Sequence, residues 1–484
     1  MTQKQRATNS SNVRKRKSRL KKKQNRTLYR ELLEFVLPQG QLFTEGEFHG
    51  NTKWIPEQLA MQALVWSWQD SKNVTDAFEK TLEVCERLGL KGVAKTYTAF
   101  MNALNRHRAI MCDRLRIRHQ ELAKQIGEKY FRTNKWVLIG FDGSRATAPR
   151  TVANEQAFCA PNYGKSGKAK ARRNKKKAKG RQRQRSSAIN AQPQEPQVWI
   201  TMMWHMGLRL PWTWRLGPSY SSERTHVQTM LEEEDFPDDT LFCGDAGFVG
   251  YPLWSSILAA GGNFLVRVGA NADLLSEDVD FKEIEGGIFL CWPKVKIASG
   301  APPLRLRLVR VTVGKTKMWM LTSVLDERKL TVAQIVSYYK MRWGIEVEFR
   351  GLKQTIDKHK LRCRNSDRLL AELDWSLRGM AIAELIALSQ QIPNKVKPTD
   401  RSLAKTLRTL RRGMRNLDKT NGPDNDLLQE LSKALVQRYC NHTDKRARYR
   451  PKNPDKKPLG DPVIRKITIE EREKLRKLEL QVAA

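Results

Sequence analysis

Residues 135–142 read Lys-Trp-Val-Leu-Ile-Gly-Phe-Asp, a short apolar run that ends on a carboxylate and is followed by glycine. A run of this length between turn residues is typical of a buried β-strand. Residues 240–243 form a second such run, which leads into Gly244-Asp245-Ala246-Gly247. An acid at the exit of a buried strand projects into the crevice beyond the sheet, so we expect Asp142 and Asp245 to lie there.

The segments around these two strands alternate between strand and helix patterns. Residues 198–204, a turn at Gly207 and residues 208–216 predict a β-hairpin. Three further elements follow the hairpin, with a strand at 263–268 and helices at 221–234 and about 251–260. A tight hairpin forces an antiparallel pair, whereas helical crossovers favour parallel strands. The fold class is therefore α/β, with a mixed sheet flanked by helices.

The flanks of this core carry different patterns. Residues 270–325 alternate short apolar runs with Gly and Pro, which predicts a β-rich segment, and helices are expected at about 331–353 and at 371–388. Residues 27–130 read as helical, with a break at Gly89. Helix, glycine-containing turn and helix suits a helix-turn-helix DNA-binding region, and it suits any other helical bundle equally.

Positive charge dominates the chain, with 89 Lys and Arg against 51 Asp and Glu and a net charge of +38. Two tracts concentrate this charge: residues 1–26 hold eleven Lys or Arg and no acid, and residues 165–185 hold twelve and no acid. Both tracts are poor in apolar residues and are expected to be disordered. Nucleic acid is the expected partner, with a ribosomal or RNA-packaging protein as the alternative and a membrane surface disfavoured.

Cysteine usage and hydropathy indicate the compartment. The seven cysteines are scattered and form no C-x-x-C pair, so the sequence predicts neither a zinc module nor a disulfide framework. No apolar run of 18 residues occurs, and the N-terminus lacks an apolar signal core. We therefore expect a protein that stays in the reducing cytoplasm and does not engage a membrane.

The expected helix at 331–353 carries the most specific pattern. Tyr339, Arg342, Glu346 and Lys353 fall on one side of a helix with about 3.6 residues per turn. A solvated helix face is the ordinary interpretation of such spacing, but the residues around Glu346 are mostly apolar, which places this acid near a core. Such a pattern suits a polyanionic ligand, because Glu346 can bind metal while Arg342 and Lys353 bind phosphate oxygens.

Tyr-x-x-Arg-x-x-x-Glu-x-x-x-x-x-x-Lys is the signature of the bacterial insertion-sequence transposases of the IS-four group, and this chain matches it in full. Phe141-Asp142-Gly143-Ser144 resembles the first acidic motif of that family, and residues 243–248 resemble the second. The order of Asp, Asp, β-rich segment and Glu is also similar. The resemblance covers about residues 131–390 and identifies the chain as a DDE transposase, associated with the bacterial nucleoid.

The resemblance implies an RNase H-like catalytic fold interrupted by a β-rich insertion, and cut-and-paste DNA movement through hairpinned transposon ends. It implies catalysis by Asp142, Asp245 and Glu346 on two Mg²⁺ or Mn²⁺ ions, with Asp142 bridging the ions. Hard, oxygen-preferring ions suit carboxylates, and two metals activate the nucleophile and stabilise the leaving oxygen of an in-line displacement. DNA phosphates would be bound by Tyr339, Arg342 and Lys353.

Two further residues are candidates for DNA contact. Arg224 lies on the expected helix before the second acid, where a surface ion pair is an equal alternative. Trp292 lies in the β-rich segment, and the resemblance implies that an insert tryptophan can stack on a flipped base. A core tryptophan is the alternative for this residue. Glu348 is a rival metal ligand, nearly opposite Glu346 on the expected helix.

These interpretations divide the chain into a disordered basic tail at 1–26, a helical N-terminal DNA-binding domain at 27–130 and an RNase H-like catalytic domain at 131–269 and 326–392. The catalytic domain carries a basic disordered insert at about 163–197 and is interrupted by a β-rich insertion domain at 270–325. A basic C-terminal region at 393–484 follows and is a possible dimerisation region. The expected protein is a homodimer on double-stranded DNA, with each protomer binding one inverted-repeat end before joining to target. The alternatives are a nuclease of this fold without strand transfer, and a non-catalytic basic nucleic-acid-binding protein.

Overall fold

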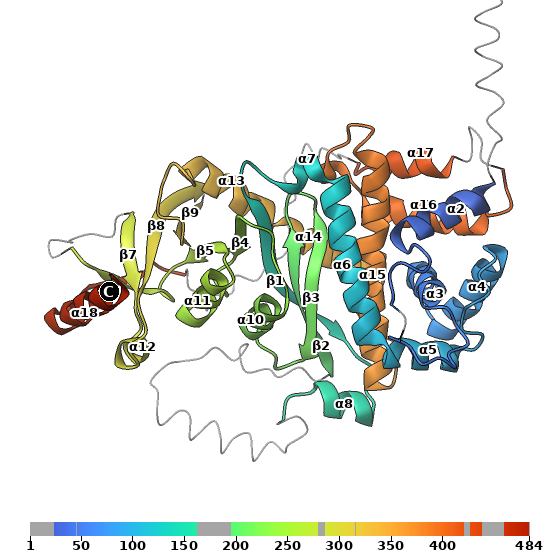
Figure 1. Cartoon of the computed structure of the whole chain (residues 1–484), viewed down its shortest axis with the longest axis horizontal. Helices are drawn as coiled ribbons and strands as arrows, with labels where there is room; N and C mark the ends of the chain where they lie inside the picture. The colour runs from blue at the N-terminus through green and yellow to red at the C-terminus, as the bar shows by residue number, and fades with distance from the viewer. Residues whose placement is uncertain are drawn as a thin grey trace, which may run out of the picture. The chain divides into compact units, whose positions relative to one another are not determined.

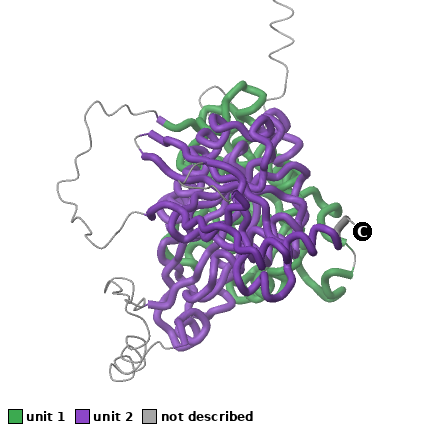
Figure 2. The backbone as a smooth tube through the Cα atoms, turned by 90° about the vertical axis from the view of Figure 1, so that its left-hand side faces the viewer, with its two compact units in different colours: residues 1–122, 374–436 green, residues 123–373, 437–484 purple. Residues whose placement is uncertain are grey.

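The computed structural model describes residues 24–44, 46–161, 195–278, 286–314, 316–420, 426–437 and 459–483. The predicted basic tail at 1–26 and the predicted basic insert at about 163–197 lie almost entirely outside these residues. The chain forms two compact units, residues 1–122 with 374–436 and residues 123–373 with 437–484 (Figure 2). We call them unit 1 and unit 2.

Unit 2 is built on a ten-stranded sheet with the strand order β10-β6-β7-β8-β9-β5-β4-β1-β2-β3. The first five strands along the chain, which we call the β1–β5 half, are β1 Val137–Thr147, β2 Gln197–His205, β3 Leu210–Pro218, β4 Thr240–Gly244 and β5 Asn263–Val268. β1, β2 and β3 form an antiparallel meander, and β4 and β5 run parallel to β1. The predicted fold class, α/β with a mixed sheet flanked by helices, is confirmed in this arrangement (Figure 1).

Helical crossovers explain why β4 and β5 run parallel to β1. α10 Glu223–Glu233 joins β3 to β4 and packs against β1, β2 and β3, and α11 Tyr251–Ala259 joins β4 to β5 and packs against β5. After the β-rich segment, α13 Val332–Arg342 packs against β1, β4 and β8. Unit 2 also contains the short helices α7 Glu128–Phe131, α8 Val152–Phe158, which packs against β3, and α12 Lys294–Ala298.

The predicted single helix over 331–353 is interrupted. Three elements replace it, namely α13 Val332–Arg342, α14 Gly344–Arg350 and a π-helical turn at Gly351–Thr355. Gly344 lies directly against Trp204 of β2, where a Cβ would collide with the indole ring. The helix breaks immediately before this close contact. A regular spacing of residues does not reveal this interruption or the close packing of Trp204 on Gly344, because that contact is made with another strand.

The β-rich segment extends the same sheet. Its strands and the last strand of the chain, which we call the β6–β10 half, are β6 Asp273–Ser276, β7 Gly287–Cys291, β8 Leu304–Val313, β9 Thr316–Thr322 and β10 Val463–Lys466. β9 pairs antiparallel with β5, so the strands predicted as an insertion continue the sheet of the β1–β5 half. β10 pairs parallel with β6, between parts of the sequence that lie far apart.

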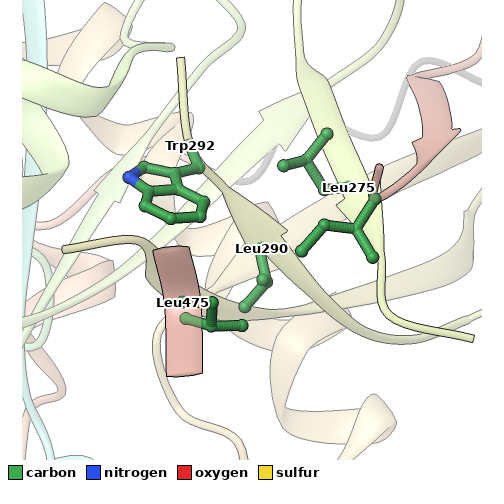
Figure 3. Close-up of a cluster of buried hydrophobic side chains, with 5 residues drawn as sticks. Leu275, Leu290, Trp292 and Leu475 are labelled. Atoms are coloured by element: carbon green, nitrogen blue, oxygen red, sulfur yellow. The ribbon is translucent and has the colours of Figure 1, made fainter. Parts of the chain in front are cut away.

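An apolar cluster packs against the β6–β10 half. Its buried members come from β6, β7, the ends of β7 and β10, and α18 Ile469–Ala483, and are Leu275, Leu290, Trp292, Ile467 and Leu475 (Figure 3). Leu475 of α18 thus packs against β6 and β7, two strands that lie far earlier in the sequence. The burial of these side chains stabilises the junction between the C-terminal segment and the sheet.

Unit 1 is helical, as predicted for residues 27–130. Its helices within that range are α2 Asn25–Val36, α3 Pro56–Trp68, α4 Val74–Arg87, α5 Tyr97–Arg106 and the larger part of α6 Arg108–Ile126. Every residue of α3 after Pro56 is buried, so this helix lies in the core of the unit. A helix that is buried on all sides has no solvent-facing side, and it belongs to the interior of a bundle.

Residues from the second half of the sequence complete unit 1. They are the larger part of α15 Ser366–Gln391, with the 3₁₀ turn Pro398–Asp400, α16 Leu403–Arg415 and α17 Leu427–Ser432. The indole N–H of Trp68 in α3 donates to the carbonyl of Gly379 at 2.8 Å, and Arg411 donates to the carbonyl of Trp68 at 2.6 Å. The N-terminal helices therefore share their core with residues on both sides of the predicted boundary at 392.

Thiols and hydropathy complete the description of the fold. Six cysteines lie in the described residues, all of them free thiols, and five are buried. Burial raises the pKa of the Cys243 thiol in β4 to about 12, which keeps it protonated and unreactive. Within the described segments, no helix combines the length and the apolar content that crossing a bilayer requires.

Candidate active site

The first two acids come from neighbouring parallel strands. Asp142 lies within β1, opposite Met202 of β2, and the prediction that it ends the strand is wrong because pairing with β2 carries β1 on to Thr147. β4 pairs with β1 only as far as Gly140, and Asp245 is the first residue after β4. Asp142 therefore lies just beyond the point where β4 ends, and both acids reach the same edge of the sheet.

The third acid is linked to the first by an arginine. The Arg342 guanidinium lies between two carboxylates, with Nη1 3.7 Å from Asp142 Oδ2 and Nη2 3.7 Å from Glu346 Oε1. Arg342 is 4% exposed, and its Nε and Nη1 have no hydrogen-bond partner among the described residues. Both separations exceed hydrogen-bond length, so the guanidinium compensates charge while its donors stay unsatisfied. A phosphate oxyanion is a ligand that can satisfy them.

The carboxylates repel one another at this edge. Burial raises the pKa of Asp142 above its ordinary value, and the charges of Asp245 and Glu346 act in the same direction. The Gly143 N–H, which donates to Asp142 Oδ1 at 2.8 Å, and the Arg342 guanidinium oppose that rise. Three acids that lie far apart in the sequence thus share one electrostatic environment.

A fourth carboxylate, Glu223, belongs to the same environment, and the sequence did not predict it. Glu223 is the first residue of α10 and follows the N-cap Ser222. Burial raises the pKa of Glu223 to about 7, and the charges of Asp142 and Asp245 add to that rise. An acid in the first turn of a helix is ordinarily explained by the helix dipole, so the local signal was weak. Only the packing of α10 on the sheet brings Glu223 to the other acids.

Tyr339 and Lys353 flank the arginine and the third acid along the chain. The Tyr339 ring is buried, and the Arg342 guanidinium lies 5.5 Å from its centroid, so the ring supports the arginine from one side. Lys353 lies half-buried in the π-helical turn, and burial lowers its pKa. A single residue in helical conformation, Trp343, separates α13 from α14, and Arg342 still meets Glu346 across it at a spacing of four residues. Phosphate contact by Tyr339 and Lys353 stays a prediction.

Arg224 is engaged with the backbone beside the second acid. Its Nη1 donates to the carbonyl of Val249 at 2.8 Å, which ties α10 to the loop that follows Asp245. Asp245 Oδ1 accepts from the N–H of Gly247 at 2.7 Å, so this loop begins with a tight turn. Arg224 therefore positions the loop of the second acid, and DNA contact by Arg224 stays a prediction.

Trp292 belongs to the other half of the sheet. Its side chain is 2% exposed within the cluster of Figure 3, and its indole N–H donates to the carbonyl of Ala301 at 2.7 Å. Stacking on an extruded base requires an exposed ring face. The burial of Trp292 therefore agrees with the core alternative and argues against the predicted contact with a flipped base.

The donor set at the sheet edge fits a hard divalent cation. All four acids offer carboxylate oxygens, the ligands that Mg²⁺ and Mn²⁺ prefer, and a shared cation would relieve their mutual repulsion. Within the described residues, no three carboxylate, thiolate or imidazole groups already form a metal cage. Mg²⁺ usually binds through one or two carboxylates together with waters and substrate phosphates, so it does not require a preformed cage.

Comparison with known proteins points to one family. Residues 207–378 match the family model described as the transposase DDE domain, a range that contains Asp245, Arg342 and Glu346. The chain is 26% identical over 152 residues to "Putative transposase y4zB" of Sinorhizobium fredii (strain NBRC 101917 / NGR234), a match that covers 31% of this chain and 43% of that relative. The chain thus matches less than half the length of this curated relative.

Among solved structures, the chain is similar to the piggyBac transposase in a synaptic complex with hairpin DNA, determined by cryo-EM. That similarity covers 87% of each chain, with 13% sequence identity and a TM-score of 0.37. The family model describes transposase DDE domains as a whole. It therefore leaves the resemblance to the IS-four group as a prediction.

Proposed function

The chain carries a transposase DDE domain over residues 207–378, and from this premise we propose that it is a cut-and-paste DNA transposase. It binds the inverted-repeat ends of a mobile element, cleaves phosphodiester bonds there through a hairpin intermediate, and joins the ends to target DNA. The signature from Tyr339 to Lys353 favours the IS-four group as its subgroup.

One observation carries the proposal. The buried Arg342 guanidinium lies between Asp142 and Glu346, at the edge of the sheet where Asp245 leaves β4. Two of the proposed acids thus lie beside a buried cation whose Nε and Nη1 have no hydrogen-bond partner among the described residues, and the charge of Asp245 acts on Asp142 through space. Transfer of a phosphoryl group in DNA needs acids that hold divalent metal and donors that bind the phosphate oxygens, and this edge offers both.

Asp142, Asp245 and Glu346 are the residues that would hold two Mg²⁺ or Mn²⁺ ions. Such ions, when bound, supply the charge that activates a water or 3′-hydroxyl and stabilises the leaving oxygen. Arg342 binds oxygens of the scissile phosphate through its unsatisfied N–H groups, and the Tyr339 ring keeps the guanidinium in place. Lys353 adds positive charge, which an anionic ligand would stabilise against the effect of burial on its pKa.

Double-stranded DNA is the proposed partner of the rest of the chain. A net charge of +38 favours phosphate backbones through counterion release, and unit 1 would bind one transposon end. Two ends must be brought together for joining, so we propose a homodimer on DNA in which each protomer cuts in trans. The C-terminal region at 393–484 would contribute to dimerisation. A DNA substrate associates the protein with the bacterial nucleoid in the cytoplasm.

A cutting and joining assay with the full chain tests the proposal. Labelled transposon ends, a target plasmid and Mg²⁺ should yield cut ends, hairpinned ends and joined products, and EDTA should suppress all three. Asp142→Asn, Asp245→Asn and Glu346→Gln should each abolish cutting, because each removes a metal ligand. The affinity of these variants for transposon ends in a gel-shift assay should match that of the wild type.

Glu348→Gln is the matched control. Glu348 is buried in the same short helix as Glu346 and carries the same charge, so this variant removes an equivalent acid that the proposal does not use. Its cutting rate should equal that of the wild type. Cutting that survives all three site substitutions would contradict the assignment of the acids. Cleavage without any joined product would favour a nuclease of this fold.

A further inference from the structure

We propose that α5 of unit 1 recognises the base sequence of a transposon end, with its exposed face in the major groove of double-stranded DNA. The inference rests on the proposed function, which gives unit 1 a transposon end to bind. It goes further because it names the helix, the groove and the side chains that contact base edges. Three features carry it: the residues of the exposed face, the charge around that face, and the packing that holds the helix.

The exposed face of α5 is narrow and carries no acid. Its exposed residues are Thr98, Ala99, Asn102 and Arg106, and the buried residues of the helix lie on its other sides. At about 3.6 residues per turn, the four exposed positions fall within a stripe about 100° wide. Asn and Arg pair with the edges of adenine and guanine in the major groove, and Thr and Ala contact the methyl group of thymine. The face therefore consists of side chains that suit base edges.

Charge distinguishes α5 from the helix before it. Residues 87–112, which include α5, hold five Lys or Arg and no acid. The exposed residues of α4 are mostly acidic, and those acids are Asp76, Glu79, Glu83 and Glu86. DNA phosphates are attracted to the first surface and repelled by the second. Of these two neighbouring helices, only α5 can therefore approach DNA favourably.

Two cations mark the ends of α5. Lys95 precedes the N-cap Thr96, Arg106 is the last residue of the helix, and both side chains are exposed. Within the part of the chain that the structure describes, neither forms an ion pair. The arginines on either side differ, because Arg87 pairs with Asp418 and Arg108 pairs with Asp374. Lys95 would thus contact a phosphate beside the groove, and Arg106 would contact a base edge within it.

Buried amides of α3 hold the loop that leads into α5. The Gln62 side chain donates to the carbonyl of Ala94 at 2.9 Å and accepts from the N–H of Ala94 at 3.0 Å. Gln58 Oε1 accepts from the N–H of Gly92 at 2.7 Å. Both glutamines are buried in the core helix of unit 1. The loop is therefore fixed to that core, and the start of α5 is positioned before DNA binds.

Aromatic packing holds the buried side of α5. The Phe100 ring centroid lies 5.5 Å from that of Trp66 in α3 and 5.2 Å from that of Phe78 in α4. The major groove of B-DNA is about 12 Å wide, so it admits a helix whose exposed side chains are short. Residues 88–96 join α4 to α5, a longer connection than the turn of about three to four residues in a helix-turn-helix. Its exposed residues therefore identify α5, and that motif does not.

Gel-shift titration of the full chain with two labelled duplexes tests the proposal. One duplex carries the terminal inverted repeat that flanks the protein's own coding DNA, and the other carries the same bases in scrambled order. Asn102→Ala and Arg106→Ala should each weaken binding to the repeat about tenfold or more, since a lost base contact costs that much. Binding to the scrambled duplex should change far less, because phosphate contacts supply non-specific affinity.

Arg408→Ala is the matched control. Arg408 is exposed on α16 of the same unit and carries the same charge as Arg106. This variant should keep the wild-type ratio between the two affinities. Because Asn102 and Arg106 are both exposed, their variants should melt at the wild-type temperature, and if one of them does not fold, the other decides the matter.

The outcomes separate this inference from the proposed function. If the α5 variants keep the wild-type ratio, or weaken both duplexes equally, the role of α5 is overturned, while Mg²⁺-dependent cutting of the repeat by the wild type upholds the proposed function. If the wild type neither prefers the repeat nor cuts it, the proposed function itself fails. Equal binding of the repeat as an RNA duplex would also overturn the role of α5, because the deep, narrow major groove of RNA does not admit a helix.

Discussion

The two halves of the unit 2 sheet belong to one hydrogen-bonded sheet but carry different side chains. In the β1–β5 half, acids gather beside Arg342, whose donors are left unsatisfied. In the β6–β10 half, apolar side chains pack together against the strands, and the Trp292 indole N–H donates to the carbonyl of Ala301. Both halves bury apolar side chains, but the β1–β5 half also gathers unfavourable charge at one edge, whereas the cluster on the β6–β10 half contributes stability through burial alone.

Removing an acid from the β1–β5 half should have the largest effect. Asp142→Asn should lower the rate of DNA cutting by at least about a hundredfold, because loss even of an outer partner at a metal site costs about 10–100-fold. Its melting temperature should equal or exceed that of the wild type, since burial raises the pKa of Asp142 and disfavours its charge. If Asp142→Asn loses stability together with activity, the acids of the β1–β5 half contribute to stability as well, which contradicts the contrast with the β6–β10 half.

Truncating Trp292 should show the reverse pattern. Trp292→Ala should lower the free energy of unfolding by about 3–5 kcal/mol, the usual cost of removing a buried aromatic side chain. Urea unfolding measures this loss, and cutting per folded molecule should remain at the wild-type rate. Leu475→Ala in α18 removes a member of the same cluster and should cost about 2–5 kcal/mol. Normal stability with lost cutting in Trp292→Ala would instead support the predicted base contact.

Adding a methyl group at Gly143 should have a moderate effect. Gly143→Ala should cost at most about 1 kcal/mol of stability, because its Cβ would overlap Glu223 Oε1 and the flexible end of that side chain can move away. Combined with Glu223→Ala, the same methyl group finds space, so the cost should shrink. Urea unfolding of both single variants and the double variant measures the coupling. Strictly additive costs would show that Glu223 does not lie over the residue after Asp142.

A further prediction concerns pH. Glu223 has an ordinary pKa of 4.5, which burial raises to about 7 in the folded chain. The folded chain therefore keeps a proton that the unfolded chain releases between these values, so this stabilising contribution is full below 4.5 and is lost as pH rises through about 7. In the metal-free protein, the stability of Glu223→Gln relative to wild type should rise over that interval. Urea unfolding at several pH values checks this, and a constant difference would contradict the shared environment.

Much of the β1–β5 half could be predicted because its signals are local. The strand Asn263–Val268 and the hairpin of β2 and β3 are apolar runs bounded by turn residues, and the structure confirms them. The proximity of Arg342 to Glu346 follows from their spacing of four residues on adjoining helical turns. Asp245 was recognisable as an acid that leaves a buried strand.

The remaining features depend on contacts between distant segments. Glu223 reaches the acids only because α10 packs on β1, and Gly344 leaves the space into which Trp204 of another strand packs. β1 continues past Asp142 because β2 pairs with it beyond that point. None of these contacts alters the local pattern of apolar and polar residues, so sequence periodicity alone could not reveal them.

The position of β10 has a consequence for how the protein is made. Its partner strand β6 leaves the ribosome long before residues 463–466 do. The outer edge of β6 therefore stays unpaired while the intervening residues are synthesised. An exposed strand edge is a template on which other chains can pair. Premature termination before residue 463 would therefore leave β6 unpaired and Leu275 without its neighbour Leu475 of α18, which would favour aggregation.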